Sequence, residues 1–347
     1  IKDVYLVTDD QGYVTWKGET TDSRVSTFAQ LAQAYAANSA NSVTATKTEK
    51  ATSTTITFTG LNLGYYLLDS SMGTLCSLNT TNPDATIQEK NEALVNTVVA
   101  RTSVDLTTKR ADGTRAVRNR ETNLGDLWAD ALRWFAVSGE INAAFDEDDV
   151  KAGNDRIAVD ADHVVALWNG GNLRADIAEG TFGAEALAEV LPFPNKVAVV
   201  YMTGAQLLET LEAASQGLPY TAETADACAS LMQVSGLTYT VDTAKAYDAL
   251  EAYGDHWFTA GSVSRVRIDD VNGQPFDAEA TYAVVTSNAN FNGMDSSYVL
   301  KAAAEANEQS AVTTAVVRDV VFRFIAAELN HQVGEAYAAP QGRLTIL

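Results

Sequence analysis

The chain has few of the residues that build disulfide frameworks or metal clusters: its 347 residues include two cysteines and three histidines. Cys76 and Cys228 are too few for a disulfide framework, and they fall in the two domains distinguished below, so we expect no disulfide between them. No uninterrupted apolar run approaches the roughly 18 residues that would indicate a membrane span. No basic-then-apolar leader follows Ile1, so we expect any export signal to be removed or to lie outside this sequence.

Basic residues are scarce as well. Lys and Arg number 24 against 45 Asp and Glu, a formal net charge of -21 at pH 7. A chain this acidic repels nucleic-acid backbones and anionic membranes, and we expect neither as a partner. Any phosphate site must therefore be built from local positive side chains. An apolar content of 46% and a charged content of 20% are typical of a globular protein, and the length suffices for two domains.

Residues 1–91 are rich in Thr and Ser and contain no His. Phe28, Leu31, Ala32 and Tyr35 repeat at helical spacing and predict one amphipathic helix. Short apolar alternations between turn residues predict strands at 2–8, 12–16, 42–47, 53–59, 64–69, 74–79 and 85–88. Many short strands with little chemistry among them favour a small β-rich sandwich domain.

Three runs in this region read Phe58-Thr-Gly-Leu-Asn-Leu-Gly-Tyr-Tyr-Leu-Leu-Asp69, Leu78-Asn-Thr-Thr-Asn-Pro-Asp84 and Ile87-Gln-Glu-Lys-Asn-Glu92. They resemble a domain of fimbrial shaft proteins (pilins) from Gram-positive bacteria, over most of 20–92. The resemblance implies an Ig-like sandwich. Such pilins often contain Lys–Asn isopeptide bonds, but Lys90 and Asn91 are sequence neighbours that cannot crosslink the domain by themselves. Only the fold is carried over.

From residue 92 onward strands alternate with helices, which indicates a second domain over 92–347 with a mixed α/β (α+β) fold. Asn123 is the expected N-cap of a helix whose apolar stripe is Leu124, Leu127, Trp128, Ala131 and Phe135. Further expected elements are strands within 95–106 and at 164–168, 196–202, 233–241, 263–268, 281–286 and 343–347, a capping box at 203–206, an Asn-Gly turn at 272–273 and a helix around 317–324. The acidic stretches 137–161 and 242–258 are expected to be surface excursions.

The stretch from His163 to Arg174 draws the most attention. The sequence predicts a buried strand from Val164 to Trp168. The strand is followed by Asn169-Gly-Gly, where glycines allow close approach of the backbone to a ligand. Arg174 supplies a charged fork suited to carboxylate or phosphate oxygens, and Phe193 follows between two prolines. Together these residues predict a pocket for a small anionic molecule. The alternative is two strand-to-loop turns with a surface arginine.

Six motifs in this second domain resemble the C-terminal domain of secreted 5'-nucleotidases. They are Arg118-Asn-Arg-Glu-Thr-Asn-Leu-Gly-Asp126, Asn169-Gly-Gly-Asn-Leu-Arg174, Val190-Leu-Pro-Phe-Pro-Asn195, Thr203-Gly-Ala-Gln-Leu-Leu208, Gln233-Val-Ser-Gly236 and Asn292-Gly-Met-Asp295. The match runs from about residue 95 to the C-terminus. In that family this domain binds the nucleotide, and a separate N-terminal metallophosphoesterase domain performs hydrolysis.

The resemblance assigns roles residue by residue. It implies that Arg118 and Arg174 hold the phosphate side of the substrate, with Asn169 beside them. Phe193 would stack on the base and Asp295 would contact the ribose. Arg forks, aromatic faces and carboxylates suit these roles chemically. The full set of expected substrate-binding residues is Arg118, Asn169, Gly170, Gly171, Arg174, Phe193, Gly236, Phe291 and Asp295.

This sequence departs from the family's pattern at the base clamp. The position of a second aromatic, six residues before the ribose acid, is Ala289, and the nearest aromatic is Phe291. Asn172 and Met294 replace glycines that are common in the motifs. Either Phe291 reaches the base from a shifted loop, or only one face of the base is covered by an aromatic ring. In both cases we expect altered base recognition.

A larger departure concerns catalysis. A dinuclear metallophosphoesterase needs clustered His, Asp and Asn ligands for two metal ions. His163, His256 and His331 are widely separated, and we interpret them as a strand-edge residue and two surface residues. We therefore expect no catalytic residue, metal or cofactor site in this chain, with divalent metals only in an absent catalytic domain.

Three functions follow as hypotheses. The first is the nucleotide-recognition half of a 5'-nucleotidase-like surface protein, which partners a nucleotide or nucleoside and a metallophosphoesterase domain elsewhere. The second is a surface structural module or adhesin that uses the nucleotidase-like domain as a scaffold. An autonomous hydrolase, the third, conflicts with the lack of a metal cluster. The resemblances imply an extracellular or wall-associated location in a Gram-positive bacterium.

Overall fold

The structure is a computed structural model that describes residues 2–8, 14–19, 44–50, 53–61, 98–145, 157, 159–221, 229–254 and 257–347. Cys76, Cys228, His256, the helix expected at 28–35 and the strands expected beyond residue 63 of the first domain lie outside these residues. The chain divides into two compact units, which are described separately. Unit 1 comprises 1–103, 179–188 and 322–334, and unit 2 comprises 104–178, 189–321 and 335–347. No helix in the described ranges is long and apolar enough to cross a membrane.

Unit 1 contains two small sheets. The first has the order β1-β2-β4-β3 and is antiparallel throughout, from β1 (Lys2–Thr8), β2 (Val14–Glu19), β3 (Thr44–Lys50) and β4 (Ser53–Leu61). These four strands agree with those predicted at the start of the chain. The second has the order β16-β5-β7, from β5 (Val98–Thr102), β7 (Gly180–Gly183) and β16 (Gln332–Val333).

His331 corrects one expectation, because it is only 7% exposed rather than a surface residue. It follows α10 (Val317–Ala327), in a turn where Asn330 and His331 both have positive φ, 47° and 61°. This left-handed pair reverses the chain, so that the His331 carbonyl accepts a hydrogen bond from the Arg101 amide.

Unit 2 is organised around a five-stranded mixed sheet with the order β15-β8-β14-β6-β9. β14 (Thr281–Ser287) runs parallel to β6 (Val164–Asn169) and antiparallel to β8 (Lys196–Thr203). β15 (Ala311–Val316) and β9 (Met232–Ser235) complete the edges. All six residues of β6 are buried, as its continuous apolar run predicts for a central strand.

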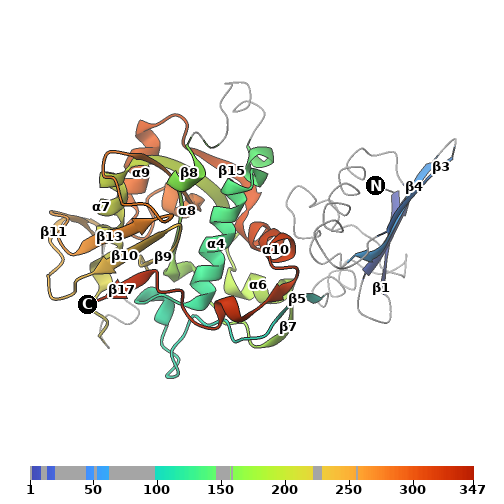
Figure 1. Cartoon of the computed structure of the whole chain (residues 1–347), viewed down its shortest axis with the longest axis horizontal. Helices are drawn as coiled ribbons and strands as arrows, with labels where there is room; N and C mark the ends of the chain where they lie inside the picture. The colour runs from blue at the N-terminus through green and yellow to red at the C-terminus, as the bar shows by residue number, and fades with distance from the viewer. Residues whose placement is uncertain are drawn as a thin grey trace. The chain divides into compact units, whose positions relative to one another are not determined.

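Helices and a second sheet cover the two faces of this sheet (Figure 1). α4 (Asn123–Val137) packs on β6 and β9. Side chains from α7 (Gly204–Ala214), α9 (Tyr298–Ala306) and the sheet β13-β10-β17 form one apolar cluster with Val165 and Leu167 of β6. The second sheet consists of β10 (Leu237–Val241), β13 (Val266–Val271) and β17 (Leu344–Ile346). The Thr203–Gln206 capping box predicted at the start of α7 is present.

The predicted stripe of α4 is confirmed, because all five of its apolar residues are at most 1% exposed. Its N-cap, however, is Thr122, whose side chain accepts from the Gly125 amide. Asn123 is the first helical residue instead. Its amide group is engaged elsewhere, donating to the carbonyls of Asp105 and Tyr337 at 2.8 and 2.7 Å.

The strand predicted over 233–241 is two strands. Gly236, with φ 81°, separates β9 from β10, and the chain passes from the five-stranded sheet into the three-stranded one at this residue. The Asn272-Gly273 turn is present, with both residues at positive φ, but β13 pairs with β10 rather than with β14. Within the polar stretch after residue 242 lies an exposed two-stranded ribbon, β11 (Ala249–Gly254) and β12 (Trp257–Ala260).

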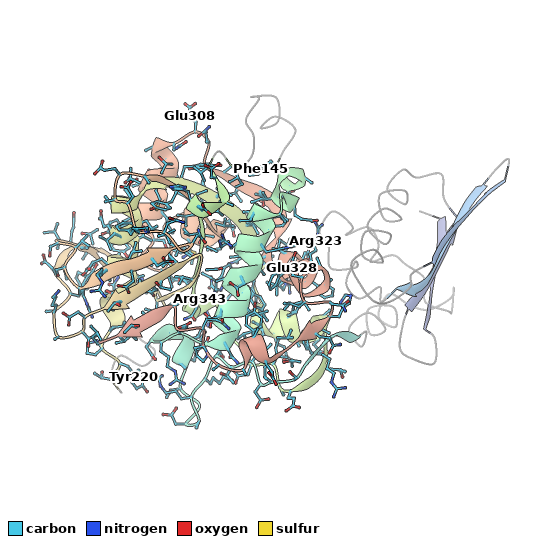
Figure 2. The ribbon with its side chains drawn as sticks, in the orientation of Figure 1. Phe145, Tyr220, Glu308, Arg323, Glu328 and Arg343 are labelled. Carbon is cyan, nitrogen blue, oxygen red and sulfur yellow. The ribbon has the colours of Figure 1, made fainter. Side chains whose placement is uncertain are left out.

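The C-terminal segment is anchored to α4 by acidic side chains. Glu121 accepts from the Arg343 and Leu344 amides at 3.0 and 3.1 Å. Asp126, fully buried, accepts from the Gln341 amide at 3.0 Å. Arg343, labelled in Figure 2, donates through Nη2 to Asp130 at 2.9 Å. This packing of the tail beside the helix places β17 next to β10.

Candidate functional site

The segments that carry most of the expected site residues lie at one edge of the five-stranded sheet. β6 and β14 are parallel neighbours, so their carboxyl ends meet at the same edge. β8 runs antiparallel to β14, so its amino end lies there too. The segments 170–174, 288–297 and 190–195 are therefore neighbours, although they are far apart in the sequence. Crevices at the carboxyl ends of strands are common ligand sites in α/β sheets.

Two glycines let a further segment reach this edge. A Cβ atom on Gly170 would overlap the carbonyl oxygen of Val117, and one on Gly171 would overlap Ala229. The 3-10 helix η5 (Gly170–Asn172) can therefore lie directly against η2 (Ala116–Arg118) and against the residues that precede β9. Close approach was predicted toward a ligand, whereas in the structure it is toward the chain's own backbone.

Arg174 and Phe193 form an exposed pair. The Arg174 amide donates to the Val190 carbonyl at 2.7 Å, which ties its loop to the segment preceding Phe193. The Arg174 guanidinium carbon lies over the Phe193 ring, 5.2 Å from its centroid, within cation–π range. Phe193 is 39% exposed, so the ring has surface left for another group.

Asp295 lies beside the arginines in the loop after α8 (Asn288–Phe291). Burial raises the pKa of Asp295, and the positive charges of Arg118 and Arg174 oppose that rise. The carboxylate therefore interacts electrostatically with both guanidinium groups. Asp295 and its neighbour Ser296 have φ of 51° and 67°, a left-handed conformation that is costly outside glycine and is often found at functional sites.

Asn169 is fully buried and connects to Asp295 directly. Its Nδ2 donates to Asp295 Oδ2 at 2.6 Å and reaches the Ala229 carbonyl at 3.5 Å. Its Oδ1 accepts from Asn172 Nδ2 at 2.8 Å. Five of the expected residues, Arg118, Asn169, Arg174, Phe193 and Asp295, are thus linked by hydrogen bonds, ring contact or electrostatic interaction at one sheet edge.

Two expected residues are not brought into this cluster. Gly236 is next to the amino end of β6, where Asn272 bonds both the Gly236 and Val164 carbonyls. That end is five residues from Asn169, or about 16 Å along the strand. Phe291 packs against the apolar cluster beneath α7 and α9. Its side chain is partly buried in this packing, and a role of Phe291 in base recognition stays a prediction.

Arg115 and Gln233 support the site, and sequence reasoning assigned neither a role. Arg115 Nη2 donates to the carbonyls of Gly171, at 3.0 Å, and Leu173. Gln233 Nε2 donates to the Val117 and Arg120 carbonyls at 3.0 and 2.9 Å, on either side of Arg118. Gln233 belongs to one of the recognised motifs, but Arg115 lies outside all of them. Its partners are backbone carbonyls, which every residue has, so the sequence does not indicate which ones Arg115 contacts.

The described ranges contain no candidate metal centre. No group of three or more His, Cys, Asp or Glu side chains there has the arrangement of a metal site. His163 is partly buried, and its ring lies 5.4 Å from that of Tyr282. The clustered residues at the sheet edge are suited to binding an anion next to an aromatic face, with a carboxylate and amides at its side.

Comparison with known proteins places this edge within a described domain. Residues 98–302 match the family described as 5'-nucleotidase, C-terminal domain. The chain is 30% identical over 182 residues to the trifunctional nucleotide phosphoesterase protein YfkN of Bacillus subtilis, covering 51% of this chain and 10% of that protein. It is 28% identical over 214 residues to the cell wall protein Lmo0130 of Listeria monocytogenes, covering 59% of this chain and 22% of that protein.

The fold is also similar to a solved structure. The 5'-nucleotidase precursor from Thermus thermophilus superposes with a TM-score of 0.50 and 28% identity, over 75% of this chain and 43% of that one. This chain therefore spans less than half the length of each of these three proteins. Since the family match covers more than half of the sequence, the chain belongs to the family of 5'-nucleotidase C-terminal domains.

Proposed function

We propose that unit 2 binds a nucleoside 5'-phosphate at the sheet edge described above. Arg118 and Arg174 hold the phosphate, Phe193 stacks on the base, and Asp295 accepts from the ribose hydroxyls. The observation that carries this proposal is geometric: Asn169 at the end of β6 holds the Asp295 carboxylate at the sheet edge where the Arg174 guanidinium lies over the exposed Phe193 ring. The charges of Arg118 and Arg174 also oppose the rise in the pKa of Asp295. An anion, a sugar and a base can each meet a suitable group within one cluster.

The local charge supports an anionic ligand. The chain as a whole carries -21, so a phosphate is repelled at long range. Two arginines whose charges act on the single carboxylate of Asp295 leave an excess of positive charge among these three groups. Each charge-assisted hydrogen bond from arginine to phosphate contributes about 1.5–3 kcal/mol. Two such hydrogen bonds contribute about 3–6 kcal/mol together, which corresponds to dissociation constants from about 6 mM down to about 40 μM.

The matching test is a calorimetric titration of the chain with AMP, adenosine and inorganic phosphate. Arg174→Ala is expected to weaken AMP binding at least tenfold and to leave adenosine binding nearly unchanged. Arg267→Ala is the control, because Arg267 is an exposed arginine of β13 paired with Asp269. Undiminished AMP affinity in Arg174→Ala, or an equal loss in Arg267→Ala, would refute the proposed site.

Hydrolysis is proposed to require a metallophosphoesterase domain outside this sequence. The bacterial relative named as a nucleotide phosphoesterase and the solved 5'-nucleotidase precursor are both much longer than this chain. We expect no phosphate release from AMP with added divalent metals. Turnover that persists through purification and is lost in Arg174→Ala would overturn this part of the proposal.

A scaffold role at the cell surface is the second candidate. It is favoured by the relative named as a cell wall protein, and it fits the proposed extracellular or wall-associated location. The antiparallel sheet β1-β2-β4-β3 is compatible with the proposed pilin-like sandwich over 1–91. A scaffold predicts no saturable nucleotide binding, so the calorimetric titration separates the two functions.

A further inference from the structure

A chain of three polar side chains runs from η5 to the loop after α8. Asn172 donates to Asn169 Oδ1 at 2.8 Å, and Asn169 donates to Asp295 Oδ2 at 2.6 Å. Asn169 is 0% exposed and Asn172 is 8% exposed. Both hydrogen-bonding ends of the Asn169 amide are thus occupied within the protein. The amide of Asn169 therefore connects Asn172 to Asp295 within the protein.

Asn172 contributes to the orientation of the Asn169 amide, together with the two acceptors Asp295 and the Ala229 carbonyl. A side-chain amide has a donor end and an acceptor end, and only one orientation presents the N–H groups to the Asp295 carboxylate. Because Asn172 Nδ2 is itself a donor, it stabilises the orientation in which Asn169 Oδ1 faces it. The reverse orientation would place two donors against each other and an oxygen against a carboxylate.

Asp295 needs such support for two physical reasons. Its backbone is in a left-handed conformation, which costs free energy for a residue with a Cβ atom. Its carboxylate also experiences the positive charges of Arg118 and Arg174, and an ion pair with either would neutralise a charge that phosphate binding requires. The hydrogen bond from Asn169 engages Oδ2, which leaves Oδ1 to accept from a ligand hydroxyl.

We propose that Asn172 and Asn169 are positioning residues that aim the Asp295 carboxylate at the sugar and so make the site selective for ribonucleotides over 2'-deoxyribonucleotides. This inference rests on the proposed nucleotide site and names the feature of the ligand that the site distinguishes. Asn172 is the informative member, because the hydrogen bonds connect its side chain to Asp295 only by way of Asn169.

The test compares AMP and 2'-deoxy-AMP binding to the full chain by calorimetry, with inorganic phosphate as a third ligand. The parent chain is expected to prefer AMP by about tenfold, the effect of one charge-assisted hydrogen bond. Asn172→Asp is nearly isosteric but replaces the donor with an acceptor, so the Asn169 amide turns away from Asp295. We expect the preference to fall to about twofold or less, while phosphate binding changes no more than in the control.

Three further measurements separate positioning from a general loss of structure. Asn172→Ser keeps a hydroxyl donor and should restore part of the preference. Asn307→Asp makes the same change of charge at the end of α9 and should leave the preference intact. The pH at which AMP binding declines on acidification should move upward in Asn172→Asp, since Asp295 would lose a hydrogen-bond donor to its charged form.

An unchanged AMP preference in both Asn172 variants, with binding retained, would overturn the inference. So would an equal loss for AMP, 2'-deoxy-AMP and phosphate, because that result would indicate a structural role. Absence of nucleotide binding in the parent chain would instead overturn the proposed function itself.

Discussion

The guanidinium group of Arg174 lies over the ring of Phe193, 5.2 Å from its centroid, although 19 positions separate the two residues in the sequence. The Arg174 amide donates to the Val190 carbonyl, which ties the Arg174 loop to the segment that precedes Phe193. One face of the aromatic ring is therefore covered by a cation. A nucleotide base that stacks on Phe193 has to use the remaining exposed surface, next to the charge that attracts its phosphate.

Replacement of Phe193 should reveal this stacking. Phe193→Leu is expected to weaken AMP binding by about 1–3 kcal/mol, the usual contribution of one base–aromatic stack. Inorganic phosphate, which has no base, should bind as before. Phe258→Leu on β12 is a matched control, since Phe258 is also 39% exposed. Equal losses in the two variants, measured by calorimetry, would contradict a specific role for Phe193.

Substitution of Gly170 should damage both the fold and the site. In Gly170→Ala the new methyl group overlaps the Val117 carbonyl oxygen, so η5 and η2 must separate. Overpacking of this kind costs about 1–3 kcal/mol or more. Gly334→Ala is the control, because nothing lies within 4 Å of its added Cβ atom. Denaturant unfolding should show a lower stability for Gly170→Ala alone, and similar stabilities would refute the close packing.

Asp126 should make the stability depend on pH. Burial first, and then the charge of Glu121, raise the pKa of Asp126 from 3.8 to about 8. Between these values the folded protein retains a proton that the unfolded chain releases. The free energy of unfolding therefore falls as pH rises from about 4 to about 8, by up to about 1.4 kcal/mol per unit, and levels off above that range.

Asp126→Asn removes this titration while it keeps an amide that imitates the protonated carboxyl group. Unfolding measured at several pH values should show a smaller decline for this variant than for the parent chain. The variant should also be more stable than the parent near pH 8. Asp277→Asn, at an exposed position, should leave the decline unchanged. A parent-like decline in Asp126→Asn would show that Asp126 is ionised in the folded state.

Glu212 should be essential for the packing of α7 against the start of β13, where Arg265 lies. Glu212 is 0% exposed, and its Oε2 accepts from the Ser264, Arg265 and Val266 amides at 3.2, 3.0 and 2.9 Å. Its charge also opposes the lowering of the Arg265 pKa that burial causes. Glu212→Gln leaves Arg265, 2% exposed, without that counter-charge.

The loss of this counter-charge and the weakening of three hydrogen bonds to the buried carboxylate are expected to cost about 3–5 kcal/mol. Glu209→Gln on the same helix is the control, because Glu209 is partly exposed and accepts a single hydrogen bond from Tyr298. The expected result in denaturant unfolding is a large loss for the first variant and a loss of about 1 kcal/mol for the second. Comparable losses would indicate that the charge of Glu212 is unimportant.

The sequence predicted the regular elements best where burial is periodic or continuous. The stripe of α4 and the run Val164 to Trp168 were recognised because core packing repeats at fixed intervals. The N-cap was assigned one residue late. Asn123 and Thr122 are both good capping residues, and the choice depends on contacts of Asn123 with Asp105 and Tyr337, which sequence neighbours do not reveal.

The site was predicted in outline for a different reason. Motif resemblance singled out Arg118, Arg174 and Asp295. Arg174 and Asp295 follow the parallel strands β6 and β14, and Arg118 belongs to η2, which packs on η5. Gly236 belongs to a motif as well, but its role is to let the chain change sheets at φ 81°. Resemblance cannot distinguish a turn that belongs to a motif from a ligand contact. Physical contacts in the folded chain are needed for that distinction.

The close packing of η5 on η2 has a consequence for how this domain can change. Because Gly170 leaves no space between the two segments, the segments that carry Arg118 and Arg174 pack directly against each other. An insertion or deletion in either segment would separate the arginines and undo the packing at the same time. New ligand preferences at this edge should therefore arise by exchange of individual side chains, such as those at positions 172 and 289, rather than by loop-length variation.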